Sequence, residues 1–162
     1  MEQFHSYYFW EIWGGTKEEA IQKVYDFHKT DYFKNIQPLE DAKIACTELK
    51  KNHELFVITS RQNDVIDATR EWVDKYFPSI FSGIHFTNHF AQNGTSVTKK
   101  EICDNLAIDI LIEDNLKFAT ECVTPKRHVL LFDYPWNQNS DLPKGIIRVY
   151  SWKEILEEIE KI

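Results

Sequence analysis

Residues 55–61 read Leu55-Phe56-Val57-Ile58-Thr59-Ser60-Arg61, an apolar run that ends abruptly in two hydroxyls and an arginine. A second run, Ile108-Asp109-Ile110-Leu111-Ile112-Glu113-Asp114-Asn115, ends in carboxylates instead. Parallel strands of an open α/β sheet present their carboxyl ends along one edge, and ligands bind at that edge. The sequence therefore predicts one strand that ends in donors for an anion and another that ends in ligands for a metal.

A helix start lies between these two strands. Residues 98–101 read Thr-Lys-Lys-Glu, which is a capping box with Thr98 as the N-cap and Glu101 three positions later. Lys99 then lies in the first turn, where its charge opposes the helix dipole. We therefore expect another group in the protein to hold Lys99.

The rest of the chain alternates between strand and helix patterns, which is typical of βαβ units and a parallel sheet. The patterns predict strands over residues 55–58, 80–86, 108–112, 129–132 and 146–149. They predict helices over about 17–33, 40–51, 63–77, 99–106, 116–122 and 151–161. No repeats, low-complexity segments or linkers interrupt them, so we expect a single domain over residues 1–162.

Composition limits the classes of partner. The chain has 162 residues, 43% hydrophobic and 28% charged, as in ordinary globular domains. A formal charge of −7 argues against nucleic acid or an anionic membrane as the main partner, but it permits small phosphates. The cysteines are odd in number and widely spaced, and the N-terminus has no signal pattern, so we expect a cytoplasmic protein with reduced thiols.

The order of hydroxyl, lysine and acidic pair resembles motifs two, three and four of the haloacid dehalogenase (HAD) superfamily of phosphohydrolases. Within it, the chain looks like the branch of 5'-nucleotidases and 5'(3')-deoxyribonucleotidases. The segments that carry this likeness are Ile58–Arg61, Trp72, Ile84–Phe86, Lys99–Cys103, Ile112–Asp114 and Asp133–Asn137. The resemblance implies a HAD-like Rossmannoid sheet flanked by helices, with a small helical cap over about residues 1–36 and an α/β core over about 37–162.

The resemblance also implies Mg²⁺-assisted hydrolysis of a phosphomonoester, with a nucleotide monophosphate as the substrate. The roles that it implies are Thr59 and Lys99 in catalysis, Thr59, Ser60, Arg61 and Lys99 in phosphate binding, and Asp114 and Glu113 in metal binding. Three of these assignments leave alternatives open. Lys100 could replace Lys99, Arg61 could face solvent, and Glu113 departs from the Asp-Asp that family members commonly carry.

Two further groups of residues lie near this expected site. The loop residues Asp133, Trp136 and Asn137 follow the strand at 129–132, and a structural role is the better reading for them. The N-terminal aromatic residues could cover either a nucleobase or exposed core. They are Tyr7, Tyr8, Phe9, Trp10 and Trp13.

One part of the family pattern is absent. The superfamily starts its reaction with an Asp-x-Asp pair on its first, central strand, and no Asp-x-Asp occurs in these 162 residues. Residues 1–15 already resemble the cap insertion that follows that strand. We therefore expect the first central strand to be missing and the chain to be inactive or severely impaired, whether through a late translation start, truncation or natural loss.

The missing strand leaves two other hypotheses open. The chain could be a non-catalytic module that binds phosphate or assembles into oligomers, or Asp64 or Glu113 could substitute as the nucleophile. Unpaired strand edges are costly, so we expect the gap to be closed by direct pairing of the strands at 55–58 and 108–112, by the N-terminal segment, or by a second copy of the chain. The last possibility predicts a homodimer.

Overall fold

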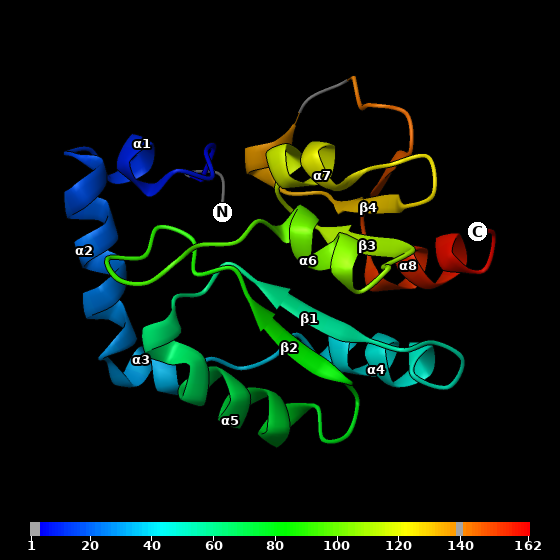
Figure 1. Ribbon diagram of the computed structural model, residues 1–162, viewed down its shortest axis with the longest axis horizontal. Coiled ribbons are helices and arrows are strands. Elements are labelled where there is room, and N and C mark those ends of the chain that lie inside the picture. Colours follow the sequence, from blue (N-terminus) through cyan, green and yellow to red (C-terminus); the bar gives the residue numbers. More distant parts are fainter. Residues whose placement is uncertain (1–3, 139–140) are drawn as a thin grey trace.

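The computed structural model describes residues 4–138 and 141–162. It has an α/β fold in which parallel sheets are flanked by helices, as the sequence predicted (Figure 1). The strands are β1 (Phe56–Thr59), β2 (Gly83–Phe86), β3 (Ile110–Glu113), β4 (His128–Phe132) and β5 (Ile146–Val149). The α-helices are α1 (Phe9–Trp13), α2 (Lys17–His28), α3 (Asp31–Lys34), α4 (Glu40–Leu49), α5 (Ile66–Tyr76), α6 (Lys99–Asn105), α7 (Leu116–Cys122) and α8 (Trp152–Ile159). Two short 3₁₀ turns are η1 (Asn63–Val65) and η2 (Pro135–Asn137).

The strands form two separate parallel sheets, in the orders β1-β2 and β3-β4-β5. Val57 of β1 lies opposite Ile84 of β2, and Leu111 of β3 lies opposite Val129 of β4. In the described part of the chain, no hydrogen-bonded pairing joins β1 to β3. Direct pairing of these two strands, one of the three closures considered from the sequence, is therefore not what the structure contains.

Side chains connect the two sheets instead. Ile58 of β1 packs against a buried cluster that includes Cys103 of α6 and Leu111 of β3. Helix α6 also contacts β1, and helix α4, which precedes β1, packs against α8 at the end of the chain. The two sheets thus share a core without sharing a ladder of backbone hydrogen bonds.

The core is centred on the middle strand of the larger sheet. The largest fully buried apolar side chains are Leu130, Leu131, Ile155, Val129 and Val149. A parallel strand that is buried on both faces has a continuous apolar sequence. Strand β4 has such a sequence from Val129 to Phe132. This rigid centre positions the turn after β3.

Local signals in the sequence explain most helix starts. The capping boxes at Thr16 and Thr98 are both present, and Ser151 accepts a hydrogen bond from the Glu154 N–H. The predicted helix over 17–33 is wrong in one respect, because it breaks after His28. Thr30 caps a separate helix, α3, by accepting a hydrogen bond from the Phe33 N–H.

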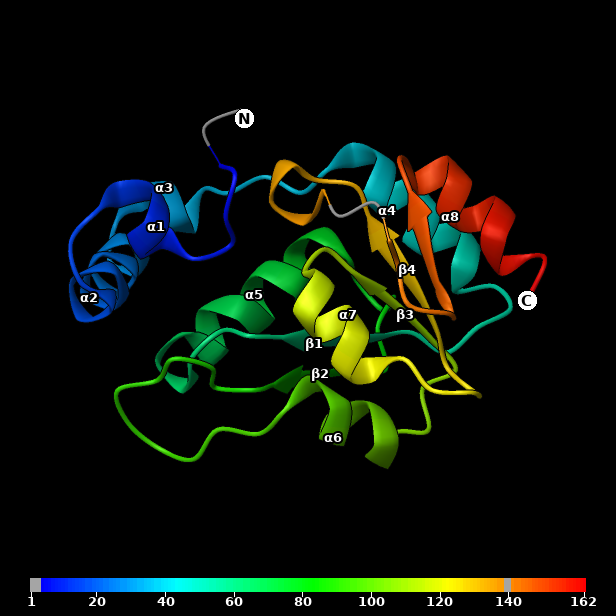
Figure 2. The same ribbon diagram turned by 90° about the horizontal axis from the view of Figure 1, so that it is seen from above.

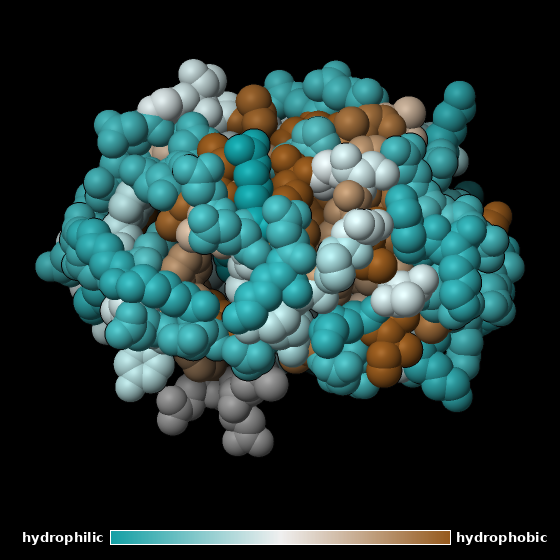
Figure 3. All heavy atoms as spheres, turned by 90° about the horizontal axis from the view of Figure 1, so that it is seen from below, coloured by the Kyte–Doolittle hydropathy of each residue, from teal (hydrophilic) through white to brown (hydrophobic). Residues whose placement is uncertain are grey.

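Helices α1, α2 and α3 lie together at one end of the molecule, away from the C-terminus (Figures 1 and 2). The short helix α1 was not predicted, because its aromatic sequence carries neither a side-chain cap nor a buried face. One face of the molecule shows hydrophobic side chains as separate patches among hydrophilic ones (Figure 3). None of the helices in the described ranges has the length and apolar character that crossing a membrane requires.

Candidate phosphate-binding site

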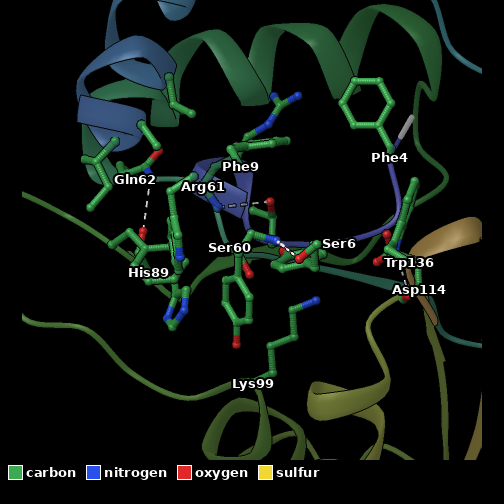
Figure 4. A pocket seen from close by; sticks show the side chains of 18 of the residues that line it. Phe4, Ser6, Phe9, Ser60, Arg61, Gln62, His89, Lys99, Asp114 and Trp136 are labelled. Atoms are coloured by element: carbon green, nitrogen blue, oxygen red, sulfur yellow. Dashed lines mark hydrogen bonds between the residues drawn. The ribbon is translucent and has the colours of Figure 1, made fainter. Parts of the chain in front are cut away.

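A cavity of about 470 Å³ lies at the carboxyl ends of β1 and β3. Thr59 and Ser60 line it from the end of β1, Asp114 from the end of β3, and Lys99 from the start of α6 (Figure 4). Aromatic side chains line much of the remainder: Phe4, Tyr7, Tyr8, Phe9, Trp10, Phe90 and Trp136. The structure thus brings the residues of three separate segments to one site, and the N-terminal segment covers it without forming a strand.

Lys99 is held as its position in the helix requires. Its ammonium Nζ lies 2.5 Å from Oε2 of Glu113, and the two side chains are 12% and 2% exposed. The ammonium also lies 5.0 Å from the ring centre of Phe118, within cation–π range. Lys100 points elsewhere and pairs with the exposed Asp104 at 2.5 Å. Of the two lysines, only Lys99 lines the cavity.

Glu113 uses both of its carboxylate oxygens within the protein. While Oε2 accepts the bond from Lys99, Oε1 accepts hydrogen bonds from the backbone N–H groups of Asp114 (3.1 Å) and Asn115 (3.0 Å). A buried carboxylate needs such partners, since an unpaired charge there is costly. Glu113 therefore fixes both Lys99 and the turn that follows β3.

Asp114 is the carboxylate that faces the cavity. Among the described residues that line it, no other side chain is acidic. Burial raises the pKa of Asp114 to about 6, and the negative charge of Glu113 adds to the effect. Asp64 does not line the cavity, and the oxygens of Glu113 are engaged, so neither is placed as a nucleophile there.

The backbone at Asp114 is held by the loop after β4. The Asp114 carbonyl accepts hydrogen bonds from Trp136 Nε1 (3.1 Å) and from Asn137 Nδ2 (2.7 Å). Asn137, which is 2% exposed, also donates to the carbonyl of Phe132 at 2.8 Å. Trp136 and Asn137 therefore hold the backbone of Asp114, the candidate metal ligand, in place.

Arg148 of β5 extends this support. Its guanidinium donates to Oδ1 of Asp133 and to Oδ1 and the carbonyl of Asn137, each at 2.7 Å. Sequence reasoning missed Arg148, because it lies inside an apolar strand pattern and far along the chain from its partners. Only the pairing of β4 with β5 brings it to the loop.

Magnesium is the metal that the family resemblance implies. Mg²⁺ is commonly bound by one or two carboxylates, with water and phosphate oxygens completing its shell. In the part of the chain that the structure describes, no group of three or more His, Cys, Asp or Glu side chains is arranged to hold a metal. Asp114 alone fits the cation, so the residues present suit a Mg²⁺ ion whose remaining ligands are water and phosphate.

The hydroxyl of Ser60 is the clearest sign of a ligand. Its Oγ is buried and makes no hydrogen bond of standard geometry within the described residues, although the Tyr7 hydroxyl lies close enough to interact with it. An unsatisfied buried hydroxyl is costly, and a phosphate oxygen at the cavity would satisfy it. Thr59 has a local task as well, because its Oγ1 accepts a hydrogen bond from the Arg61 N–H at 3.3 Å.

Arg61 does not join Ser60 and Lys99. Its guanidinium donates to Thr69 Oγ1 at 3.0 Å and lies 5.1 Å from the ring centre of Phe33. Figure 4 shows Arg61 and Lys99 on opposite sides of the cavity, with side chains that point in different directions. Arg61 therefore does not face bulk solvent, one of the two alternatives that the sequence left open, and its contact with a phosphate stays a prediction.

Comparisons with known proteins identify the family. The family model of 5' nucleotidase, deoxy (pyrimidine), cytosolic type C protein matches residues 1–161. The chain belongs to this family. The predicted placement in the nucleotidase branch of the haloacid dehalogenase superfamily is therefore confirmed.

Among relatives, the chain is 31% identical over 137 residues to a 5'(3')-deoxyribonucleotidase of Bacillus subtilis, covering 82% of this chain and 67% of the relative. The same figures hold for a 5'(3')-deoxyribonucleotidase of Bacillus phage SPbeta. A nucleotidase of Clostridium acetobutylicum is 28% identical over 147 residues, covering 89% of this chain and 70% of that protein.

A solved structure shows the same fold. It is the crystal structure of a protein from Lactobacillus delbrueckii subsp. bulgaricus, provisionally described as a phosphoglycolate phosphatase. It matches with a TM-score of 0.59 at 14% sequence identity, over 92% of this chain and 74% of its own. At this identity the likeness establishes the HAD-like fold, and the nucleotidase assignment depends on the sequence relatives.

Proposed function

We propose that this chain forms the phosphate- and Mg²⁺-binding core of a nucleotidase-type phosphomonoesterase. Its ligand is a nucleotide monophosphate, which binds with its phosphate at Ser60, Thr59 and Lys99 and with Mg²⁺ at Asp114. The observation that carries the proposal is the convergence of the buried Ser60 hydroxyl, the Lys99 ammonium and the Asp114 carboxylate on one cavity. The family and the deoxyribonucleotidase relatives support the choice of nucleotide.

These 162 residues do not turn the ligand over by themselves. Covalent phosphoryl transfer needs an attacking group, and the family's Asp-x-Asp does not occur in the sequence. The only carboxylate among the described lining residues, Asp114, is assigned to the metal. In this proposal the chain binds, orients and neutralises a phosphate but lacks the nucleophile.

Isothermal titration of deoxythymidine 5'-monophosphate with Mg²⁺ tests the binding. We expect Lys99→Met/Glu113→Gln to weaken binding by about tenfold or more, because hydrogen bonds to charged groups contribute roughly 1.5–3 kcal/mol. The double change removes both members of the buried pair, so no lone charge remains to disturb the fold. Ser60→Ala should weaken binding several-fold, whereas Lys100→Met and the exposed Ser82→Ala serve as controls. Binding that is equal in all variants would refute the site.

The alternative is a non-catalytic role as a phosphate-binding or oligomeric module. It is favoured by one observation, the strands β1 and β3, each of which lacks a strand partner on one side in the described part of the chain. Such edges are covered in stable proteins, often by another chain. We propose a homodimer in either case, with the segment up to Trp13 or these strand edges at the contact.

Exposed aromatic side chains on the N-terminal segment support the first contact. Phe9 and Trp13 stack on one another with ring centres 4.5 Å apart, yet remain 39% and 43% exposed. Light scattering at tens of micromolar should report a dimer, and Phe9→Ser/Trp13→Ser should shift it to monomer. A wild-type monomer that unfolds cooperatively would rule the dimer out. We also propose that the protein resides in the cytoplasm, where the buried Cys46, Cys103 and Cys122 stay reduced.

A further inference from the structure

The phosphate-binding cavity continues into a second one. The neighbouring cavity, of about 840 Å³, is lined by Phe4 and Ile36, by residues of α1, α2 and α3, and by Arg61 after β1. The wall that both cavities share consists of Phe4, Phe9, Val24, His28 and Arg61. Ser60 lines only the first of these two cavities, whereas Arg61 lies in the shared wall, so one ligand could meet Ser60 at one end and Arg61 at the other.

The charge of Arg61 has no counter-ion within the described residues. Apart from its bond to Thr69 and its contact with Phe33, the guanidinium makes no ion pair there. Burial disfavours its charged form and lowers its pKa. Asp64 is near enough to act on the pKa of His28, but it forms no ion pair with Arg61. A guanidinium has five N–H donors, so several remain for a ligand.

His28 adds a second unsatisfied polar group to the same wall. Its Nδ1 is buried without a hydrogen-bond partner in the described part of the chain, and its ring lies 4.7 Å from that of Phe33. Lys23 lines the outer part of the second cavity, 5.7 Å from the ring centre of Trp13. No acidic side chain is found among the described residues that line this second cavity.

We propose that Arg61 and His28 form a second anion subsite, which binds a second phosphate on the same ligand. This inference rests on the proposed function, because the first phosphate is taken to bind at Ser60 and Lys99. A planar guanidinium with free donors matches two oxygens of a phosphate, and the ammonium of Lys23, which lines the same cavity, favours a doubly charged group over a singly charged one. The ligand class is thus a nucleoside bisphosphate.

The test compares two ligands in three proteins. Deoxythymidine 5'-monophosphate and deoxythymidine 3',5'-bisphosphate are titrated with Mg²⁺ into the wild type, Arg61→Met and Arg70→Met. Arg70 is an exposed arginine in the next helix, α5. Its replacement therefore controls for the loss of one positive charge. We expect the wild type and Arg70→Met to prefer the bisphosphate by about tenfold or more, as for a charge-assisted contact.

In Arg61→Met, the preference should disappear while the affinity for the monophosphate changes by less than about threefold. Arg61→Lys, which keeps the charge but not the fork of donors, should retain part of the preference. Circular dichroism and urea unfolding establish that each variant is folded, and Arg61→Lys replaces Arg61→Met if the latter is not. If the wild type does not prefer the bisphosphate, or if the preference remains without the guanidinium, the second subsite is wrong while the proposed function stands. If neither nucleotide binds the wild type, both the subsite and the proposed function are wrong.

Discussion

The Lys99 ammonium and the Glu113 carboxylate form a buried ion pair 2.5 Å apart, across the boundary between α6 and the end of β3. Its two members come from different segments, and both belong to the set of residues that the sequence singled out. Glu113 is 2% exposed and Lys99 is 12% exposed, so the pair is shielded from water beside the cavity that Lys99 lines. Its removal is therefore informative about both stability and binding.

Replacing Lys99 alone should destabilise the protein strongly. Lys99→Met leaves the Glu113 carboxylate buried without its partner, which costs about 3–5 kcal/mol. Urea unfolding should show this loss, and Lys99→Met/Glu113→Gln should recover most of it. Lys100→Met is the matched control, because its exposed pair with Asp104 contributes no more than about 1 kcal/mol. Equal effects of the two single lysine changes would contradict the pairing.

Removing the Asn137 side chain should loosen the turn at Asp114. Asn137→Ala removes the donor to the Phe132 carbonyl and one of the two donors to the Asp114 carbonyl, which keeps Trp136, and a buried group left unsatisfied costs about 1–3 kcal/mol. Thermal or urea unfolding should show the loss, whereas Asn52→Ala, at an exposed position, should be neutral. Mg²⁺-dependent nucleotide binding should also weaken, since Asp114 would no longer be oriented. A fully stable Asn137→Ala would mean that the loop is held in some other way.

The contribution of His28 to stability should fall as the pH is lowered through the range in which histidine normally titrates, whereas Asp114, with its raised pKa, has the opposite effect in both proteins compared below. Burial lowers the pKa of His28 below its usual value of 6.5, and the positive charge of Arg61 lowers it further. The unfolded chain then binds the proton more tightly than the folded one, so unfolding becomes easier below about pH 6.5. Urea unfolding at pH 7.5 and pH 5.5 should show a smaller decrease for His28→Gln than for the wild type.

The comparison of the two proteins matters, because burial also lowers the pKa of His89. His89 contributes to the decrease in both proteins, and only the difference between them reports on His28. A pH dependence that is identical in the wild type and His28→Gln would show that His28 can accept a proton without cost.

The chain should show no phosphatase turnover with Mg²⁺ and p-nitrophenyl phosphate or deoxynucleoside monophosphates. The reason is the lack of an Asp-x-Asp pair in the sequence, without which no aspartyl-phosphate can form. Asp114→Asn controls for a contaminating enzyme, because contamination would be unaffected by it. Turnover by the wild type that disappears in Asp114→Asn would contradict this prediction.

The sequence allowed the strands and the polar residues at their ends to be predicted because those signals are local. The turn after β1, the capping box at Thr98 and the acidic end of β3 each occupy a few adjacent residues. The unfavourable position of the Lys99 charge near a helix start predicted that some group would hold Lys99. The sequence did not identify that group. Its identity depended on the arrangement of α6 beside β3, which no local pattern specifies.

Other features could not be predicted, because they depend on long-range packing. Arg148 meets Asn137 only through the pairing of β5 with β4, and the direction of Arg61 depends on Phe33 and Thr69 from two different helices. The pattern of apolar residues also did not predict the break of the long N-terminal helix after His28. There, Thr30 offers a competing cap, and its hydroxyl also donates to the Phe27 carbonyl at 2.7 Å.

The separation of β1 from β3 has a consequence for how the molecule opens. We expect each sheet, with the helices packed on it, to exchange its amide hydrogens as a cooperative unit of its own, since the described residues form no ladder of backbone hydrogen bonds between the two sheets. Ser60 lies on one unit, and Lys99 and Asp114 lie on the other. A phosphate held between them would tie the units together, so that bound ligand would merge two opening events into one and slow exchange in β1 and β3 by the same factor.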